Sequence, residues 1–561
     1  MRGNNGRSIR RVVGHLWLWI DRGLSSVKRR HEGQCSPTRL RASRSNSMLS
    51  IRWPLVSILA IAYLLALRLA FLGLVNLMPE EAYYWNYAQH LDFGYLDHPP
   101  MVAWLIWLST SVLGKSEFSV RLPAYISWAI AALFMFRLTV NLYDKSAAIR
   151  SVLLMAALPI YFGLGFFMTP DAPLNAAWAG SLYFLERALI AENRKAWWGV
   201  GLCLGFGLLS KYTIALLGLA TLTFVLIARQ SRRWLLRREP YLAALGSVIL
   251  FSPVVLWNMR NDWISFLFQG PERWSGTSEL SLHWLLVSCL LVLTPAGLLG
   301  VIEILLPRRP TGMTSPADMY GKQRFWVLSF TLIPLCVFVI HSLFHETKLH
   351  WAAPVWLAAI PLLSCGMVPE RDRIVGSLAR LGQRLWMPTI IVLLLAHTGF
   401  LSYVSLGLPG APPVSKIRAF GDWRAMADRV EKIEKSVKDK TGSEPVTVGM
   451  DKYPISSELS FYDFVDNNDT GGPHLFGGRS LMWAFWLPES AVLGRNFLMV
   501  DFDRQRLGDL SLSQYFDATS GVFTEALEKD GRLIGYFHWR VGYGYRGIGT
   551  RKRGAESGSD P

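Results

Sequence analysis

The sequence predicts an all-α polytopic membrane protein with about 11 transmembrane helices and a small C-terminal α/β domain. Three observations support this prediction. Hydrophobic residues make up 51% of the 561 residues and charged residues only 18%, whereas a typical soluble chain has about 25% charged residues. The apolar residues gather in runs near the length that a helix needs to cross a bilayer. Basic residues crowd a few of the connections between those runs.

Residues 49–405 contain the apolar runs, and we interpret this part of the chain as the transmembrane domain. Residues 99–113 are also apolar, but they follow two prolines, so we expect a helix that lies at the membrane interface. The predicted spans are residues 51–73, 119–142, 150–168, 172–192, 196–210, 212–228, 240–257, 284–305, 325–344, 350–367 and 385–405.

The connections between the spans determine the predicted orientation. Arginines and lysines cluster around Arg232, Arg308 and Arg371, and loops rich in these residues stay on the cytoplasmic side of a membrane. With the N-terminus inside, all three clusters fall on that side, and an odd number of spans then places the residues after 405 outside. A net charge of +17 is typical of a multi-pass protein that concentrates basic residues on its cytoplasmic loops, so we expect no nucleic-acid partner.

Residues 1–48 form a basic N-terminal arm that we expect to be disordered, and its one apolar patch is too short to span a bilayer. Met48 stands directly before the first span and is a second candidate for the natural start of the chain. Residues 551–561 are polar and are predicted to be a disordered tail. The five cysteines share no CxxC spacing, so neither a disulfide framework nor a zinc ribbon follows.

Residues 406–550 are predicted to form the small α/β domain, on the outer side of the membrane. Apolar residues recur at steps of three and four within residues 421–440, which predicts an amphipathic helix. Short runs of apolar residues predict strands at 446–450, 496–500 and 536–541.

Acidic motifs gather in the connections that the predicted topology places outside. The longest connection, residues 74–118, holds Glu80-Glu81 and then Asp97-His98, close to prolines and aromatic residues. A short connection holds Asp171 between two prolines. Because a carboxylate near the bilayer is costly unless it is paired or functional, we predict an active site at the outer membrane surface.

These residue types are suited to group transfer. One carboxylate can act as the general base that takes a proton from an acceptor hydroxyl. A second carboxylate can orient the acceptor or bind a divalent cation, and no other cofactor follows from the sequence. Lys348, or His98 when protonated, can hold a phosphate leaving group as charge develops on it. Tyr84 and Trp85 offer aromatic faces to a sugar.

Each motif also has a purely structural interpretation, and both interpretations stay open at this point. Pro79 at the first position of a helix, with Glu80 and Glu81 in the first turn, is a pattern that caps a helix. Asp171 can be a turn residue. The stretch 345–350 holds two histidines, but their spacing is not the HExxH of a helical zinc site, and we predict no metal ligand.

The combination of Glu80-Glu81-Ala-Tyr-Tyr-Trp, Gly94-Tyr-Leu-Asp-His-Pro-Pro and Thr169-Pro-Asp-Ala-Pro resembles the bacterial branch of the GT-C glycosyltransferases. This branch includes the protein O-mannosyltransferase-like family 39, the aminoarabinose lipid A transferase and the rhizobial lipopolysaccharide galacturonosyltransferases. The resemblance covers roughly residues 50–405 and implies a GT-C helical bundle in the bacterial inner membrane. It also implies a polyprenyl-phosphate-linked sugar donor, a cell-envelope glycolipid or protein acceptor, and transfer with inversion on the periplasmic side.

The resemblance also implies roles for single residues. Glu80 takes the position of the catalytic base, where the family pattern has Asp, and Asp171 matches the second acidic motif. Asp97-His98 stands where the aminoarabinose transferase has Glu-Lys, and that lysine is thought to contact the lipid phosphate. Because an unperturbed histidine is mostly neutral at about pH 7, Lys348 is the alternative source of that charge. The other predicted substrate-binding residues are Glu81, Tyr84, Trp85, Lys211 and Tyr212.

Two other classes of protein are alternatives to an enzyme. A multi-pass lipid-linked sugar transporter or flippase needs charged residues within its spans, broken helices and often internal repeats. The sequence has no evident repeat, and its acidic motifs lie in outer connections rather than within spans. A non-catalytic scaffold for envelope assembly leaves the clustered carboxylates unexplained. We therefore expect a glycosyltransferase.

Overall fold

The computed structural model describes residues 47–270, 280–305, 317–345, 348, 350–368, 377–406, 422–463, 469–529 and 532–548. The described residues from Pro54 onward belong to one compact unit. The N-terminal arm up to residue 46, the tail from Arg551 and the basic connections around Arg308 and Arg371 lie outside the described residues.

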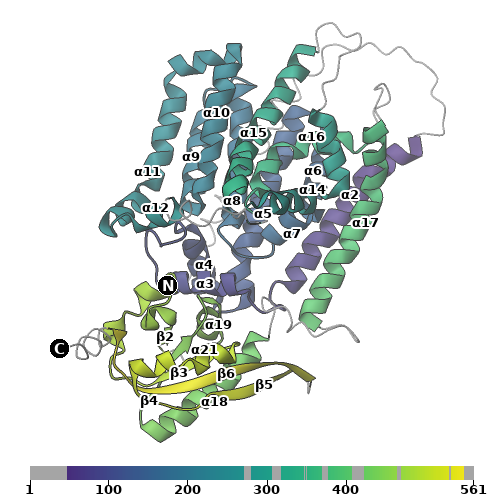
Figure 1. Ribbon diagram of the computed structural model, residues 1–561. Helices are drawn as coiled ribbons and strands as arrows, with labels where there is room; N and C mark the ends of the chain where they lie inside the picture. The colour runs from purple at the N-terminus through teal and green to yellow at the C-terminus, as the bar shows by residue number, and fades with distance from the viewer. Residues whose placement is uncertain are drawn as a thin grey trace, which may run out of the picture. The chain divides into compact units, whose positions relative to one another are not determined.

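Helices form most of the described residues up to 406 (Figure 1). In chain order they are α2 Ser47–Phe71, α3 Pro79–Gln89, α4 Met101–Leu113, α5 Glu117–Leu142, α6 Lys145–Ala157, α7 Pro159–Leu164, α8 Asp171–Leu189, α9 Ala196–Ser210, η1 Tyr212–Ile214, α10 Ala215–Ile227, η2 Arg229–Leu236, α11 Arg238–Arg260, α12 Ile264–Gln269, α14 Leu282–Leu305, α15 Ala317–Phe344, η3 Ala353–Ala358, α16 Ile360–Gly366 and α17 Ser377–Leu406.

Six helices of the described chain are long and apolar enough to cross a membrane, and they lie within α2, α5, α11, α14, α15 and α17. The segment Tyr212–Ile227 makes a seventh if it is counted together with Arg229–Leu236, from which it is bent by 115°. All seven coincide with predicted spans, and the full count of eleven stays a prediction. The apolar helix α4, predicted to lie at the interface, is one of the shorter ones.

Two predicted spans, 150–168 and 350–367, differ from the structure because neither is one unbroken helix. The first is divided into α6 and α7 at Leu158, whose backbone is extended, and Pro159 starts the second helix. The second is divided into η3 and α16, each with a proline in its first turn. Proline lacks the N–H that would continue a preceding helix, which explains both breaks.

The break after α6 is stabilised by side chains of three other helices. A helix end leaves backbone carbonyl groups without partners, and its partial negative charge favours a nearby cation. Arg68 of α2 is such a cation, and it is buried between the rings of Trp128 and Phe162. The three contacts at this end are Arg68 to the carbonyl of Ala156 (2.9 Å), Trp128 to Met155 (3.0 Å) and His397 to Ala157 (2.8 Å).

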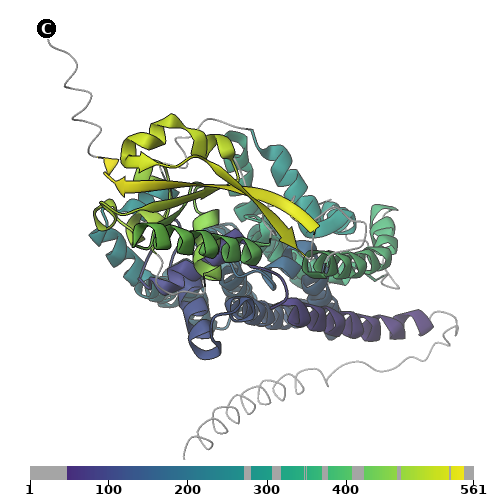
Figure 2. The same ribbon diagram turned by 90° about the horizontal axis from the view of Figure 1, so that it is seen from below.

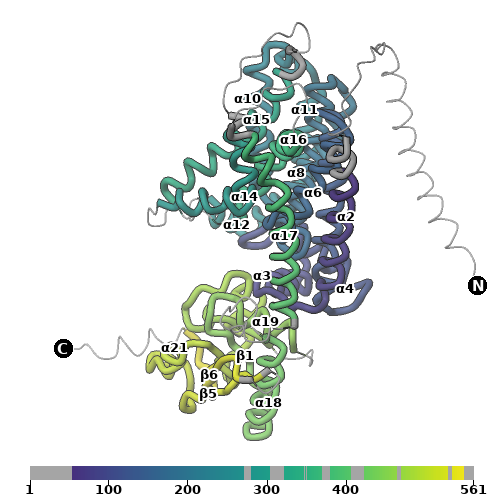
Figure 3. Tube along the Cα trace, turned by 90° about the vertical axis from the view of Figure 1, so that its right-hand side faces the viewer, coloured from purple at the N-terminus to yellow at the C-terminus, as the bar shows by residue number. Residues whose placement is uncertain are grey.

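Close packing of the helices fixes where the connections lie. Figures 1 and 3 show α2 and α17 side by side, and Tyr63 Oη lies 2.6 Å from Thr398 Oγ1 between them. α9 approaches α11 at Gly201, where a Cβ atom would stand 2.7 Å from the carbonyl oxygen of Ala243. Only glycine permits this approach. The close packing of α9 on α11 holds α9 in place, and α9 ends just before Lys211.

The described residues after 422 contain a sheet of six strands with helices packed against it (Figure 2). The strand order is β2-β1-β3-β6-β4, and β5 also pairs with β6. β1 is parallel to β2 and β3, whereas β6 is antiparallel to its three partners. The elements are α18 Trp423–Thr441, β1 Val446–Gly449, α19 Pro454–Tyr462, β2 Thr470–Gly471, η6 Pro473–Phe476, α20 Trp483–Trp486, η7 Glu489–Ala491, β3 Phe497–Asp501, α21 Arg504–Gly508, η8 Leu510–Tyr515, β4 Phe516–Thr519, β5 Phe523–Lys529 and β6 Arg532–Tyr545.

The predicted helix over 421–440 corresponds to α18, and the three predicted strands correspond to β1, β3 and part of β6. The apolar stripe of α18 is buried, as its spacing predicts: Trp423, Met426, Val430, Ile433 and Val437. The sequence did not predict β2, β4 and β5, because β2 has two residues and β4 four, and β5 alternates without a clear apolar face.

Candidate active site

Glu81 of α3 connects the two acidic motifs. It is fully buried, and Arg121 of α5 pairs with it through both oxygens, with Nε 3.0 Å from Oε1 and Nη2 2.6 Å from Oε2. Its carboxylate also accepts the backbone N–H groups of Met78 (3.0 Å) and Met168 (2.9 Å). The bond to Met78 is the cap expected at a helix start, and the bond to Met168 fixes the segment that leads to Asp171.

Asp171 is the first residue of α8, and its side chain is almost fully buried. Lys211, directly after α9, donates from Nζ to Oδ1 (2.9 Å) and Oδ2 (3.0 Å). His350 Nε2 lies 3.6 Å from Oδ2. The N-terminus of a helix favours a negative charge, so Asp171 is a carboxylate held by a helix dipole and by a cation. It is not a simple turn residue.

His98 connects this group to α3. Its ring meets the ring of Tyr84 edge to face at 5.6 Å, and when His98 is protonated its charge lowers the pKa of Asp171. The neighbouring Asp97 is buried and accepts hydrogen bonds from Tyr83 (3.2 Å) and Tyr87. Asp97 therefore organises an aromatic cluster next to His98.

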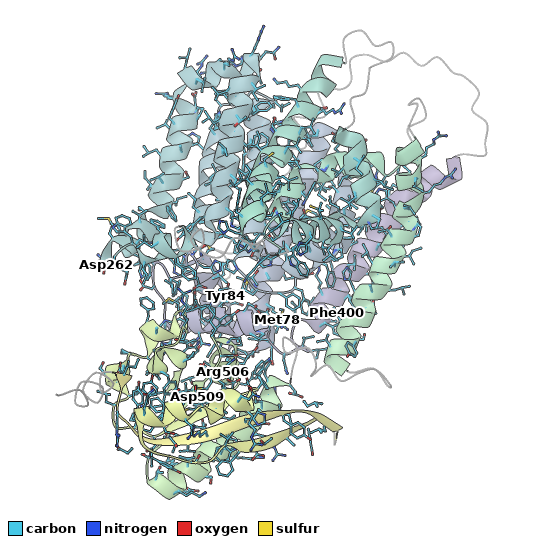
Figure 4. All side chains as sticks on the ribbon, in the orientation of Figure 1. Met78, Tyr84, Asp262, Phe400, Arg506 and Asp509 are labelled. Carbon is cyan, nitrogen blue, oxygen red and sulfur yellow. The ribbon has the colours of Figure 1, made fainter. Side chains whose placement is uncertain are left out.

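Glu80 lies in a different environment from its neighbour Glu81. Its side chain is half-buried. Tyr453, which lies in the part of the chain after the helical region, donates a hydrogen bond to Glu80 Oε1 at 3.3 Å. Figure 4 labels Met78, directly before α3, and Tyr84 within it, and both lie between the long helices and the sheet. Glu80 is thus placed where these two parts of the chain meet.

The remaining predicted residues have distinct surroundings. Tyr212 shares a hydrogen bond with Ser265 (3.1 Å). Lys348 is exposed, and its charge acts on His350. Trp85 is buried against Phe461 at a ring distance of 5.1 Å, so its ring is less accessible to a sugar than the sequence suggested.

The structure thus brings Lys211, His350 and His98 close to Asp171, and Lys348 close to His350. Sequence reasoning missed three residues of the surroundings. His350 gave no signal beyond a rejected metal spacing. Arg121 was a charged residue inside a predicted span, which is a recognised sign of function or pairing. Tyr453 lies 373 positions from Glu80, and no local pattern reports such a contact.

Within the ranges that the structure describes, no three His, Cys, Asp or Glu side chains are placed to hold a metal ion. The divalent cation suggested by the paired carboxylates stays a prediction.

Over parts of its length the chain is similar to known glycosyl transferases. Residues 97–257 match the family described as dolichyl-phosphate-mannose-protein mannosyltransferase. The chain is 30% identical over 180 residues to an undecaprenyl phosphate-alpha-4-amino-4-deoxy-L-arabinose arabinosyl transferase of Pectobacterium carotovorum subsp. carotovorum, covering 31% of this chain and 32% of that one. It is 26% identical over 194 residues to the lipid A galacturonosyltransferase RgtD of Rhizobium johnstonii, covering 33% and 38%. The chain therefore spans about a third of the length of these curated relatives.

Solved structures show the fold over a much larger part of the chain. ArnT from Cupriavidus metallidurans in the apo state superposes with a TM-score of 0.57 at 16% identity, covering 88% of this chain and 98% of that one. The same protein bound to undecaprenyl phosphate gives a TM-score of 0.57 at 18% identity, covering 86% and 97%. At such low identity these likenesses establish the fold alone.

Proposed function

We propose, from the resemblance to GT-C glycosyltransferases that the comparisons confirm, that this chain is an integral membrane glycosyltransferase. Its donor is a polyprenyl-phosphate-linked sugar. Its acceptor is a cell-envelope glycolipid of the lipid A or lipopolysaccharide type, or a protein. The transfer inverts the sugar and takes place on the periplasmic side of the bacterial inner membrane.

The observation that supports this proposal best is the group around Asp171. A buried carboxylate, the ammonium group of Lys211 and the imidazole of His350 meet next to His98. A negatively charged phosphate leaving group needs positive partners as the sugar departs. Lys211, Lys348 and His98 are the groups that can provide this charge.

The proposed reaction uses Glu80 as the general base. The acceptor hydroxyl oxygen forms a bond to the anomeric carbon of the sugar while the bond from that carbon to the phosphate oxygen breaks. The hydroxyl proton passes to the carboxylate of Glu80, and the polyprenyl phosphate leaves with the bonding electron pair. Asp171 holds Lys211 in place, so the positive charge is oriented before the donor arrives.

The names of the relatives indicate which substrates to test first. The relatives in Pectobacterium and Rhizobium are named for undecaprenyl phosphate-linked 4-amino-4-deoxy-L-arabinose and for lipid A. Undecaprenyl-phosphate sugars are therefore the first donors to offer, and lipid A is the first acceptor.

We also propose the topology that the basic connections predict. Residues 49–405 cross the membrane eleven times, the arm 1–48 is cytoplasmic, and residues 406–550 are a periplasmic α/β domain. Pairs at the end of α8 opposite Asp171 support this orientation. Arg233 pairs with Glu192, and Lys322 Nζ lies 3.9 Å from the same carboxylate, so basic connections gather at that end.

The test compares sugar transfer in membranes that contain equal amounts of wild type, Glu80→Gln and Asp171→Asn. Loss of a general base lowers the rate by about 10²–10⁴, so we expect Glu80→Gln to insert normally and to lose most transfer. We expect Asp171→Asn to insert normally and to lose most transfer as well, because Lys211 then lacks the carboxylate that orients its charge. Glu431→Gln, on the surface of α18, is the matched control. If Glu80 only caps α3, the glutamine variant loses about 0.3–1 kcal/mol of stability and keeps near-normal transfer, and the base role is wrong.

A further inference from the structure

The helix α19 attaches the C-terminal sheet to the candidate site. It packs along α3, and Asn86 of α3 bonds it twice: Nδ2 donates to the carbonyl of Ser457 (3.3 Å), and Oδ1 accepts from Ser460 (2.8 Å). These two bonds lie one to two turns away from Glu80. They position α19 on α3 whether or not Glu80 has a partner.

The far end of α19 is anchored separately. The hydroxyl of Tyr462 accepts the backbone N–H of Leu77 (2.9 Å), just before α3, and donates to Glu117 (3.2 Å) at the start of α5. Arg424 of α18 completes this anchor with a 2.6 Å ion pair to Glu117. α19 is therefore held at both ends of its contact with the helical region.

Glu458 of α19 lies within the contact between α19 and the helical region. It is fully buried, and neither of its carboxyl oxygens has a hydrogen-bond partner among the described residues. The adjacent Arg121 is already used by Glu81 and by three backbone carbonyl groups. Burial and the charge of Glu81 raise the pKa of Glu458 well above its usual range, which favours its protonated form and lessens its repulsion of the carboxylates of α3.

Tyr453 stands directly before α19 and reaches the first acidic residue. Its hydroxyl donates to Glu80 Oε1 at 3.3 Å, and its ring packs against the ring of Tyr83 at 4.8 Å. Burial, with the charge of Glu80 second, raises the pKa of Tyr453, so the phenol keeps its proton and acts as a donor. The other charged groups that act on it are Asp97 and Asp451.

We propose that Tyr453 is a positioning residue for the proposed base: the C-terminal residues deliver its hydroxyl through α19 and thereby orient the carboxylate of Glu80. This inference rests on the proposed function. The bond is long for an O–H···O contact, as catalytic hydrogen bonds often are before substrate binds. The C-terminal residues are then part of the catalytic apparatus, and the helical region alone holds an incompletely oriented base.

The experiment measures sugar transfer against pH in membranes with wild type, Tyr453→Phe and Tyr462→Phe. A hydrogen bond to a charged group corresponds to about a 10- to 100-fold change in rate, and we expect Tyr453→Phe to lose this much kcat with little change in KM for the donor. Loss of a donor disfavours the ionised carboxylate, so the acidic limb of its pH profile moves to higher pH.

Tyr462→Phe is the matched control, because it removes a tyrosine hydroxyl from the other end of α19 without touching Glu80. We expect it to lower thermal stability and to leave the acidic limb where it is. An unmoved limb in Tyr453→Phe, or an equal shift in both variants, overturns the positioning role.

Glu80→Gln in the same assay separates this inference from the proposed function. If Glu80→Gln is inactive and Tyr453→Phe behaves as wild type, only the inference fails. If Glu80→Gln transfers sugar normally, the base assignment fails and the role of Tyr453 fails with it.

Discussion

Glu80 and Glu81 are consecutive acids with opposite surroundings. Glu81 is fully buried, is paired with Arg121 and accepts two backbone N–H groups. Glu80 is half-buried and has a hydrogen bond from Tyr453. One position can therefore hold the fold together while the next is available for chemistry.

The pair of Glu81 and Arg121 leads to a stability prediction. Removing one partner of a buried ion pair leaves an uncompensated charge and costs about 3–5 kcal/mol. We expect Glu81→Gln to lower the thermal unfolding temperature of the protein in detergent, and Glu80→Gln to leave it close to wild type. Equal unfolding temperatures for Glu81→Gln and wild type would show that the pair is not needed for the fold.

Single residues differ in how far the sequence predicts them. The start of α3 at Pro79 follows from the preference of proline for the first helical position, and the structure has it there. The partner of Glu81 lies 40 positions away and could not be assigned, because periodicity describes only neighbours along one element. His350 was missed for the same reason, since its contact with Asp171 is made only by folding.

Among the elements, α18 has a buried acid on its apolar face. Glu434 is almost fully buried and accepts a hydrogen bond from Thr447 of β1. Burial nevertheless raises its pKa from 4.5 to about 7. Between these values the folded chain binds more protons than the unfolded chain, so stability falls as pH rises through this window.

This shift predicts a pH-dependent difference between variants of α18. Wild type loses up to about 1.4 kcal/mol of its free energy of unfolding per pH unit in this window, and Glu434→Gln does not. The unfolding temperature of Glu434→Gln therefore depends less on pH between about 4.5 and about 7. Thermal unfolding in detergent across this range measures the difference. Asp439→Asn, at an exposed position of the same helix, is the control. Parallel pH curves for wild type and Glu434→Gln would refute the assignment.

Long elements were predictable and their interruptions were not. The apolar runs predicted the helices that can cross a membrane, and the steps of three and four predicted α18. The breaks at Leu158 and between η3 and α16 depend on prolines inside apolar runs. Prolines also occur inside α2, α5 and α11 without ending them, so the sequence alone does not tell the two cases apart.

For the whole molecule, the two ends of the helices differ in chemistry. Glu192 gathers Arg233 and Lys322 at the end where α8 stops. Asp171 and Lys211 lie at the other end, where α8 starts and α9 stops. The positive connections and the candidate active site are thus separated by the length of these helices.

This separation predicts the orientation in the membrane. A reporter that is active only in the periplasm should give a signal when it is fused after Leu408 and none when it is fused after Arg233, because basic connections stay in the cytoplasm. The fusions are compared at equal expression. The reverse pattern would place the candidate site on the cytoplasmic side and would exclude the proposed reaction there.

One measurement decides whether the chain is a sugar transferase that acts on the cell envelope. Envelope glycolipids are compared by mass spectrometry in cells that lack the chain, supplemented with wild type or with Asp171→Asn. We predict a glycolipid with one additional sugar in cells with wild type, and its absence in the other two. Identical glycolipids in all three would overturn the assignment of a glycolipid as acceptor.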